Sequence, residues 1–184
     1  PIFASTTDSS FFWSSSTTVW NSQSVFRIDF NDGIISGDSK VWSGHARAVR
    51  GEYTPTESIL IDVGDGTVMD TVTCLQWQKT TMDTNGDGSP DPMSWHQAIE
   101  ATETLTLSEW SDWRLPNINE LRSIIKYNQL NPATDPALAT TTQLDNYWSS
   151  TTALQDTSKA WTLGLDKGYD GVNLKDLEYY VRAV

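Results

Sequence analysis

The stretch Trp148-Ser149-Ser150-Thr151-Thr152 determines how this chain is organised, because a close copy of it stands near the start. The copy is Trp13-Ser14-Ser15-Ser16-Thr17, at an offset of 135 positions, the difference between 148 and 13. The same offset aligns Arg47-Ala48-Val49 with Arg182-Ala183-Val184 without insertion or deletion. Self-similarity at one fixed offset is typical of a repeated structural unit, here as long as a whole domain.

The repeat predicts an incomplete module followed by a complete one. We expect residues 1–50 to be the C-terminal part of a first module, residues 51–58 to be a linker and residues 59–184 to be a complete module. Pro1 aligns with Pro136, which follows Asp135. If the first module also has Asp before its proline, the chain starts at an acid-labile Asp–Pro bond. We then expect a fragment of a longer array, with the missing front part still associated.

Charge and composition exclude several classes of partner. The chain has 184 residues, a net charge of −12 and 38% hydrophobic residues. Such an acidic surface repels nucleic acid, sulfated glycans and anionic lipids. No apolar run approaches the ~20 residues that a membrane-spanning helix needs. We expect neither nucleic-acid binding nor membrane insertion, and we expect any export signal to lie upstream of this chain.

Local patterns predict an α+β fold. Two segments, Ser94-Trp95-His96-Gln97 and Asn117-Ile118-Asn119-Glu120, have the form of a capping box and are expected to begin helices. Strands are expected before and after these helices, at 26–30, 46–50, 59–61, 67–69, 73–78, 147–150, 160–165 and 179–182. A module with strands at both ends and two helices between them belongs to the α+β class.

The sequence resembles a known family. Asp112-Trp113-Arg114-Leu115-Pro116-Asn117 is followed by Tyr147-Trp148-Ser149-Ser150-Thr151, with Trp95-x-x-Ala98 before them and Val181-Arg182 after them. In this order the segments are similar to the Lcl C-terminal domain family, which is named for a collagen-like bacterial adhesin. The resemblance spans residues 59–184, and residues 1–50 resemble the C-terminal third of the family.

The resemblance implies a C-type-lectin-like domain in a tandem repeat whose first module is incomplete. It also implies a secreted or cell-surface bacterial protein, so we expect an extracellular or bacterial cell-surface location. One family member is implicated in adhesion through sulfated polysaccharide. That specificity is not expected here, because a chain with a net charge of −12 repels a polyanion.

Residues 83–91 carry the clearest chemical signal. The sequence Asp-Thr-Asn-Gly-Asp-Gly-Ser-Pro-Asp has oxygen ligands at positions 1, 3, 5 and 9 and glycine at position 6. Position 12 is Ser94 instead of an EF-hand glutamate, so the segment resembles the shorter calcium loops of dockerin-like and thrombospondin-like repeats. The alternative is a solvated acidic turn. We expect a structural calcium ion with ligands from Asp83, Asn85, Asp87, Asp91 and the Ser89 carbonyl.

Tryptophans and arginines divide into structural and candidate binding residues. Trp77, Trp113, Trp148 and Trp161 lie in the family pattern and are expected in the core. Trp20, Trp42 and Trp110 are weak candidates for stacking on sugar rings. Arg47, Arg114 and Arg182 lie in apolar strands, where the alternatives are an anion site or a structural arginine paired with Glu120 or Asp112.

Catalytic constellations are absent from the sequence. His45 and His96 are the only histidines, and no spacing of His, Cys and Asp fits a triad or a zinc site. Formylglycine-generating enzymes have a related fold but need a cysteine pair. Cys74 is the single cysteine, and we expect it to be a small buried hydrophobic residue. The chain is therefore not expected to be an enzyme.

The sequence favours a non-enzymatic extracellular binding or adhesion module that recognises carbohydrate or a surface protein. The alternative is a structural subunit of an extracellular filament, stalk or sheath, assembled through neighbouring modules of the array. A lectin gathers exposed aromatic residues in one concave patch, whereas an assembly subunit distributes them over two complementary faces.

Overall fold

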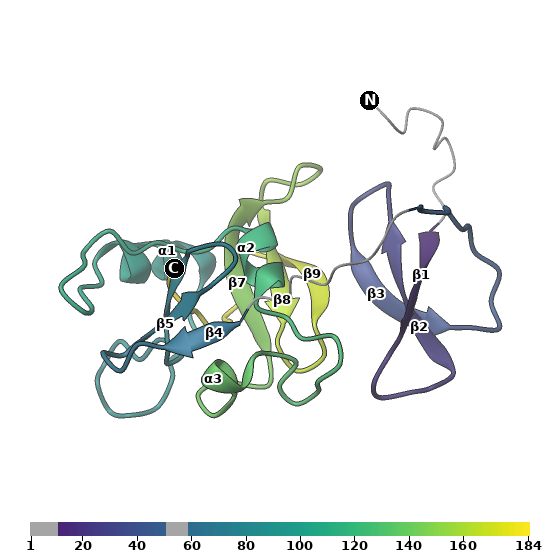
Figure 1. Ribbon diagram of the computed structural model, residues 1–184. Coiled ribbons are helices and arrows are strands. Elements are labelled where there is room, and N and C mark those ends of the chain that lie inside the picture. The colour runs from purple at the N-terminus through teal and green to yellow at the C-terminus, as the bar shows by residue number, and fades with distance from the viewer. Residues whose placement is uncertain (1–10, 51–58) are drawn as a thin grey trace. The chain divides into compact units, whose positions relative to one another are not determined.

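The computed structural model describes residues 11–50 and 59–184 (Figure 1). The chain separates into two compact units, Pro1–Pro55 and Thr56–Val184. The predicted linker at 51–58 and the predicted start at Pro1 lie outside the described residues. Among the residues that are described, no helix is long and apolar enough to cross a membrane.

The first unit contains a three-stranded antiparallel meander. Its strands are β1 (Phe11–Thr17), β2 (Ser24–Asp29) and β3 (Ile35–Ser39), in the order β1-β2-β3. The turn between β2 and β3 contains Gly33 at a φ of 82°, a left-handed conformation that glycine adopts without a Cβ clash. The predicted strand at 46–50 does not form, so that prediction is wrong for this unit.

The second unit contains two further antiparallel sheets. One has the order β4-β5-β6, with β4 (Leu60–Asp62), β5 (Thr67–Asp70) and β6 (Gln76–Gln78). The other has the order β7-β8-β9, with β7 (Asn146–Thr152), β8 (Lys159–Gly164) and β9 (Tyr169–Leu174). Strand β6 is shorter than predicted because Cys74 has a φ of 59°, which interrupts extended backbone.

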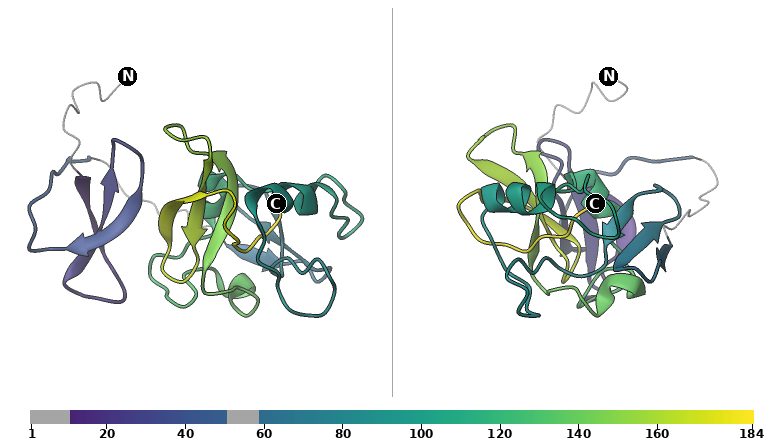
Figure 2. Two further views of the ribbon diagram at one scale, coloured as in Figure 1. Left: turned by 180° about the vertical axis from the view of Figure 1, so that it is seen from behind. Right: turned by 90° about the vertical axis from the view of Figure 1, so that its left-hand side faces the viewer.

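Short helices cover the β7–β9 sheet. Helix α1 (Trp95–Glu103) contacts β7, and α2 (Ile118–Ser123) contacts β7 and β8 (Figure 2). Helix α3 (Pro136–Ala139) lies near β4. Both predicted capping boxes form, as the Ser94 N–H donates to Gln97 Oε1 (2.9 Å) and the Asn117 N–H to Glu120 Oε2 (2.7 Å). Small helices with antiparallel sheets confirm the predicted α+β class.

The sequence offset of 135 positions is also present in the backbone. Adding it to the bounds of β1 and β2 gives those of β7 and β8. Strand β1 shifts register between Trp13 and Thr17, and β7 does so between Trp148 and Thr152. Both units therefore contain the same meander.

An equivalent lysine forms the same hydrogen bond within each meander. The ammonium of Lys40 donates to Thr17 Oγ1 (2.7 Å), and that of Lys175 donates to Thr152 Oγ1 (2.9 Å). The common backbone thus carries a common side-chain interaction.

Aromatic and aliphatic residues form two clusters in the core of the second unit. Trp77 and Tyr147 belong to one cluster, and Trp113 and Trp148 belong to the other. The expected core positions of Trp77, Trp113 and Trp148 are confirmed. Trp161 is half-buried and packs against the first of these clusters. The core prediction therefore holds for three of the four tryptophans of the family pattern, and Trp161 lies at the edge of the core.

Arg182 is buried between these elements without a carboxylate partner. Its guanidinium donates to the carbonyls of Gln78 (3.1 Å) and Lys79 and to Thr142 Oγ1 (3.0 Å). Burial lowers the pKa of this guanidinium. The expected pairing of Arg182 with Glu120 or Asp112 is wrong, because backbone carbonyls and hydroxyls take the place of the carboxylate.

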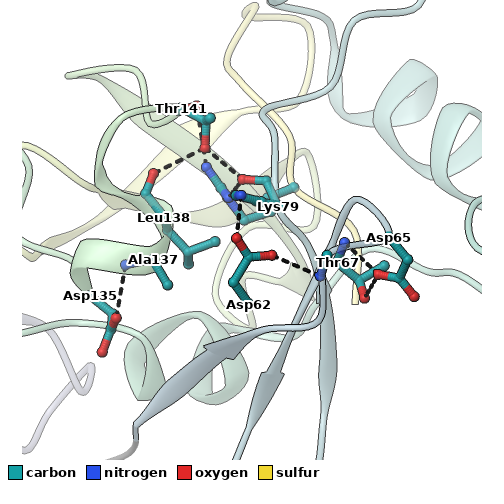
Figure 3. A network of polar contacts seen from close by, with 10 residues as sticks. Asp62, Asp65, Thr67, Lys79, Asp135, Ala137, Leu138 and Thr141 are labelled. Atoms are coloured by element: carbon teal, nitrogen blue, oxygen red, sulfur yellow. Dashed lines mark hydrogen bonds and ion pairs between the residues drawn. The ribbon is translucent and has the colours of Figure 1, made fainter.

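The Lys79 backbone that receives Arg182 is held by a polar network (Figure 3). Thr141 Oγ1 donates to the Lys79 carbonyl (2.6 Å), while the Lys79 ammonium forms an ion pair with Asp62. The Thr141 hydroxyl is also within hydrogen-bond distance of the Leu138 carbonyl (3.0 Å) in α3. The residue after β6 is therefore fixed by β4, by the α3 region and by Arg182.

We expect Arg182→Met to destabilise the second unit by about 2–4 kcal/mol, because it leaves buried carbonyl and hydroxyl groups without a donor. The matched variant Arg47→Met is expected to change the free energy of unfolding by no more than about 0.5 kcal/mol, since Arg47 is exposed. Urea denaturation followed by tryptophan fluorescence measures both. Equal destabilisation by the two variants would contradict this account.

Candidate functional site

An open hollow of about 300 Å³ on the second unit combines aromatic, apolar and charged groups. We call it the Trp110 hollow. Its lining residues come from the segment before β6, from the loop between α1 and α2 and from the last residue of the chain: Cys74, Leu75, Gln76, Trp110, Asp112, Trp113, Arg114 and Val184.

A tight turn presents Trp110 at the edge of this hollow. Leu107 and Trp110 exchange two backbone hydrogen bonds of 3.1 Å each. Between them, Ser108 and Glu109 have φ values of 54° and 68°, a left-handed conformation that is costly for residues with a Cβ. The Ser108 hydroxyl donates to the Asp65 carboxylate and thereby helps to hold the turn. Trp110 is 55% exposed as a result.

The lining of the hollow also contains Cys74, which is exposed. The prediction that Cys74 is buried is wrong. Its N–H donates to the Asp70 carbonyl (3.0 Å), and Asp70 Oδ1 accepts from the N–H groups of Val72 (2.8 Å) and Thr73 (3.2 Å). This closes a turn at the surface, and the thiol belongs to that turn instead of to the core.

In the hollow, the loop between α1 and α2 pairs with the C-terminal residue of the second unit. Arg114 and Val184 exchange backbone hydrogen bonds of 3.0 Å in both directions. Trp113, which is buried, donates its indole N–H to the Leu107 carbonyl (3.2 Å). The floor is therefore rigid, and it supports the turn that presents Trp110.

Charged groups stand at the rim. Arg114 forms two parallel hydrogen bonds of 2.8 Å each with the Glu120 carboxylate, which confirms the expected pairing with Glu120. These hydrogen bonds raise the pKa of Arg114 and hold the pKa of Glu120 below its ordinary value. Asp112 is exposed on the same loop. The hollow thus offers an indole face, a carboxylate and a fixed guanidinium.

The acidic loop at 83–91 is organised by its own side chains. The Asp83 carboxylate accepts from the N–H groups of Gly86 (2.7 Å) and Gly88 (2.8 Å). Asp91 Oδ2 accepts from the N–H (2.8 Å) and the hydroxyl (2.7 Å) of Thr84, and these hydrogen bonds lower the pKa of Asp91. The two ends of the predicted calcium loop are therefore linked to each other.

No three His, Cys, Asp or Glu side chains within residues 11–50 and 59–184 come together as a metal-binding group. Asp87 Oδ1 accepts from the Ser89 N–H (2.8 Å), and Asn85 Oδ1 accepts from the Asp87 N–H (2.8 Å). A carboxylate has about four lone-pair sites, so these hydrogen bonds leave capacity for a cation. Calcium at this loop stays a prediction.

The three candidate tryptophans occupy different settings. Trp110 lines the hollow, and Trp42 in the first unit is 59% exposed. Trp20, also in the first unit, packs edge-on against Phe26 with a centroid distance of 5.4 Å. Of the three, Trp110 is the one that lines the hollow of the second unit.

Sequence reasoning missed the contribution of Cys74 to the hollow and the turn at Ser108 and Glu109. Neither of those turn residues is a glycine or asparagine, so no composition signal marks this turn. The sequence signals near the hollow were the candidate Trp110 and the Asp112-Trp113-Arg114 motif, which supplies three of its lining residues.

Comparison with known proteins identifies one family. Residues 66–184, more than half of the chain, match the family model of the Lcl C-terminal domain. No curated protein and no solved structure matches the chain.

Glu120→Gln is expected to lower the free energy of unfolding by about 1 kcal/mol at pH 7, because the charge-assisted bonds to Arg114 are weakened. The pKa of Glu120 lies below its ordinary value of 4.5 in the folded protein. Its ionised form therefore stabilises the fold above pH 4.5, and this contribution is lost as the pH falls through the lower folded-state pKa. Urea denaturation at pH 7 and pH 3 measures the difference between variant and wild type, which should be smaller at pH 3.

Double substitution provides the control for the Glu120 prediction. Arg114→Gln combined with Glu120→Gln should cost less than the sum of the two single variants, because both remove the same interaction. Strict additivity, or an unchanged difference at pH 3, would contradict the role given to this pair.

Millimolar calcium is expected to raise the thermal unfolding midpoint of the second unit, and EDTA should reverse the effect, because a bound ion stabilises the folded loop. At a calcium concentration of 100 times Kd the gain is about 2.7 kcal/mol. Asp91→Asn should abolish the shift, while Asp156→Asn, outside the loop, should keep it. Identical unfolding in calcium and in EDTA would identify residues 83–91 as a solvated turn.

Proposed function

The chain belongs to the Lcl C-terminal domain family, and on that premise we propose that it is a non-enzymatic binding or adhesion module. We place it in a secreted or surface-displayed bacterial protein, with a C-type-lectin-like fold and tandem modules. Its ligand is an uncharged carbohydrate, or a surface partner that carries one, bound at the Trp110 hollow. Calcium at residues 83–91 is a structural ion in this proposal.

Trp110 is the observation that carries the proposal. An exposed indole beside a hollow is matched to a sugar ring, which has an apolar face and a rim of hydroxyl groups. Asp112 can accept hydrogen bonds from those hydroxyls, and Arg114, already oriented by Glu120, can donate them. A mainly apolar site with a few convergent polar groups is the usual composition of a small-ligand site.

Electrostatics favours an uncharged ligand over a polyanion. With 24 acidic and 12 basic residues, the chain has a net charge of −12. The guanidinium at the hollow is already neutralised by Glu120. A sulfated glycan would meet long-range repulsion without a free cationic cluster in the hollow to offset it.

The residues of the hollow support binding rather than catalysis. Neither histidine lines it. His96 lies on α1, edge-on to Trp95 at 5.2 Å, and His45 lies in the first unit. Among the other lining residues the only side-chain carboxylate is that of Asp112, and no histidine is there to activate the exposed thiol of Cys74.

A structural role in an extracellular filament, stalk or sheath is the second candidate. The first unit exposes several large apolar side chains, Phe30, Val41, Trp42 and Val49. Contacts between modules could cover these residues, and such contacts are the basis of assembly. In this role the binding free energy comes from contacts with neighbouring modules instead of from contacts with a sugar.

A glycan array with Trp110→Ala tests the first candidate. Wild-type protein should bind a set of neutral glycans, and Trp110→Ala should weaken that binding at least about tenfold, because the stacking surface is lost. Trp42→Ala, at a similarly exposed tryptophan, is the matched control and should bind as wild type. Each variant is assayed in calcium and in EDTA.

Two outcomes would redirect the proposal. Wild-type binding that survives in Trp110→Ala would move the glycan site away from the hollow. No glycan binding on the array, together with a particle mass that grows with concentration in light scattering, would favour the assembly role.

A further inference from the structure

Equivalent residues of the two meanders differ in what covers them. Val184 is 9% exposed, whereas Val49, its counterpart, is 96% exposed. Leu165 is fully buried, whereas Phe30 is 48% exposed. The same backbone therefore carries a covered apolar face in the second unit and an open one in the first.

In the second unit the cover comes from residues that precede the meander in sequence. The Gln78 N–H donates to the Ala183 carbonyl (3.0 Å), and the Met82 N–H donates to the Val181 carbonyl (2.9 Å). Arg114 and Val184 form the reciprocal pair described above. The closing segment 179–184 is thus held by backbone hydrogen bonds with residues 78–114.

The pairing of the closing segment with the first strand of the meander is the same in both units. Trp148 and Tyr180 are joined by a backbone hydrogen bond of 3.0 Å, and the equivalent bond from Trp13 to His45 is 2.9 Å. His45 also donates to the Phe11 carbonyl (3.1 Å), as Tyr180 does to that of Asn146 (3.1 Å). The segment at 44–49 therefore starts beside β1 as the segment at 179–184 starts beside β7.

The two segments differ at the positions that the preceding chain covers in the second unit. Within residues 11–50 and 59–184, Ala46, Ala48 and Val49 form no backbone hydrogen bond, although their counterparts Val181, Ala183 and Val184 do. All three are exposed. The first unit thus presents a backbone edge and an apolar face at the positions that the second unit covers with its own preceding chain.

We propose that this edge and face bind a polypeptide segment with the fold of residues 59–135. A backbone edge is complementary to another backbone, and the apolar side chains beside it are complementary to a protein core. The second unit supplies the template, because residues 78–114 of its own chain pair with the equivalent segment 179–184. This inference is independent of glycan binding at the Trp110 hollow.

The test extends the full chain with a second copy of residues 59–135 joined directly ahead of Pro1. Hydrogen exchange measured by mass spectrometry reports on the amides of 44–49. We expect their exchange to slow by at least about 100-fold, toward that of 179–184, because the open edge becomes paired. Val49→Asp should restore fast exchange in the extended chain and change nothing in the unextended chain.

A third protein tests whether the added segment can fold and pair when it precedes a meander. It consists of residues 59–184 twice in succession, so that the added segment precedes its own native meander. Protection of the first closing segment in this protein, without protection of 44–49 in the extended chain, would overturn the proposal. Slow exchange of 44–49 in the unextended chain at dimer mass would also overturn it, because a second copy would then be the occupant.

Discussion

The buried guanidinium of Arg182 is the constraint on which the second unit depends. A buried charge must be surrounded by polar partners, and here these are the carbonyls after β6 and the hydroxyl of Thr142. Their positions require β6, the α3 region and the closing segment to meet at one point. The Thr141 hydroxyl donates to the same Lys79 carbonyl and so holds this backbone as well.

The Trp110 hollow follows from this arrangement. Once Arg182 holds the closing segment, Val184 pairs with Arg114, and the pair forms the floor on which Trp113 rests. The left-handed turn at Ser108 and Glu109 costs free energy, so the packed floor and the bond to Asp65 must hold it. A preformed platform of this kind loses little entropy when a ligand binds.

Sequence reasoning predicted features that depend on neighbouring residues or on the repeat. The capping box at Asn117 and Glu120 is local, and the pairing of Glu120 with Arg114 joins residues six positions apart. Sequence reasoning failed for Cys74, whose exposure follows from a turn closed by Asp70. It also failed for the partners of Arg182, which are more than 100 positions away at Gln78 and Lys79. Distant carbonyls leave no signal in residue identity, because every residue has one.

Arg47 and Arg182 show why the repeated motif does not by itself define an environment. Both occur in the sequence Arg-Ala-Val and follow the same meander, yet one is exposed and the other is fully buried. Burial of Arg182 is tolerated because acceptors from β6 and the α3 region surround it. Arg47, in contrast, stays exposed to water and its guanidinium lies over the Phe12 ring, 5.5 Å from the centroid. The motif therefore encodes a closing segment, and the preceding chain decides whether that segment becomes part of a core.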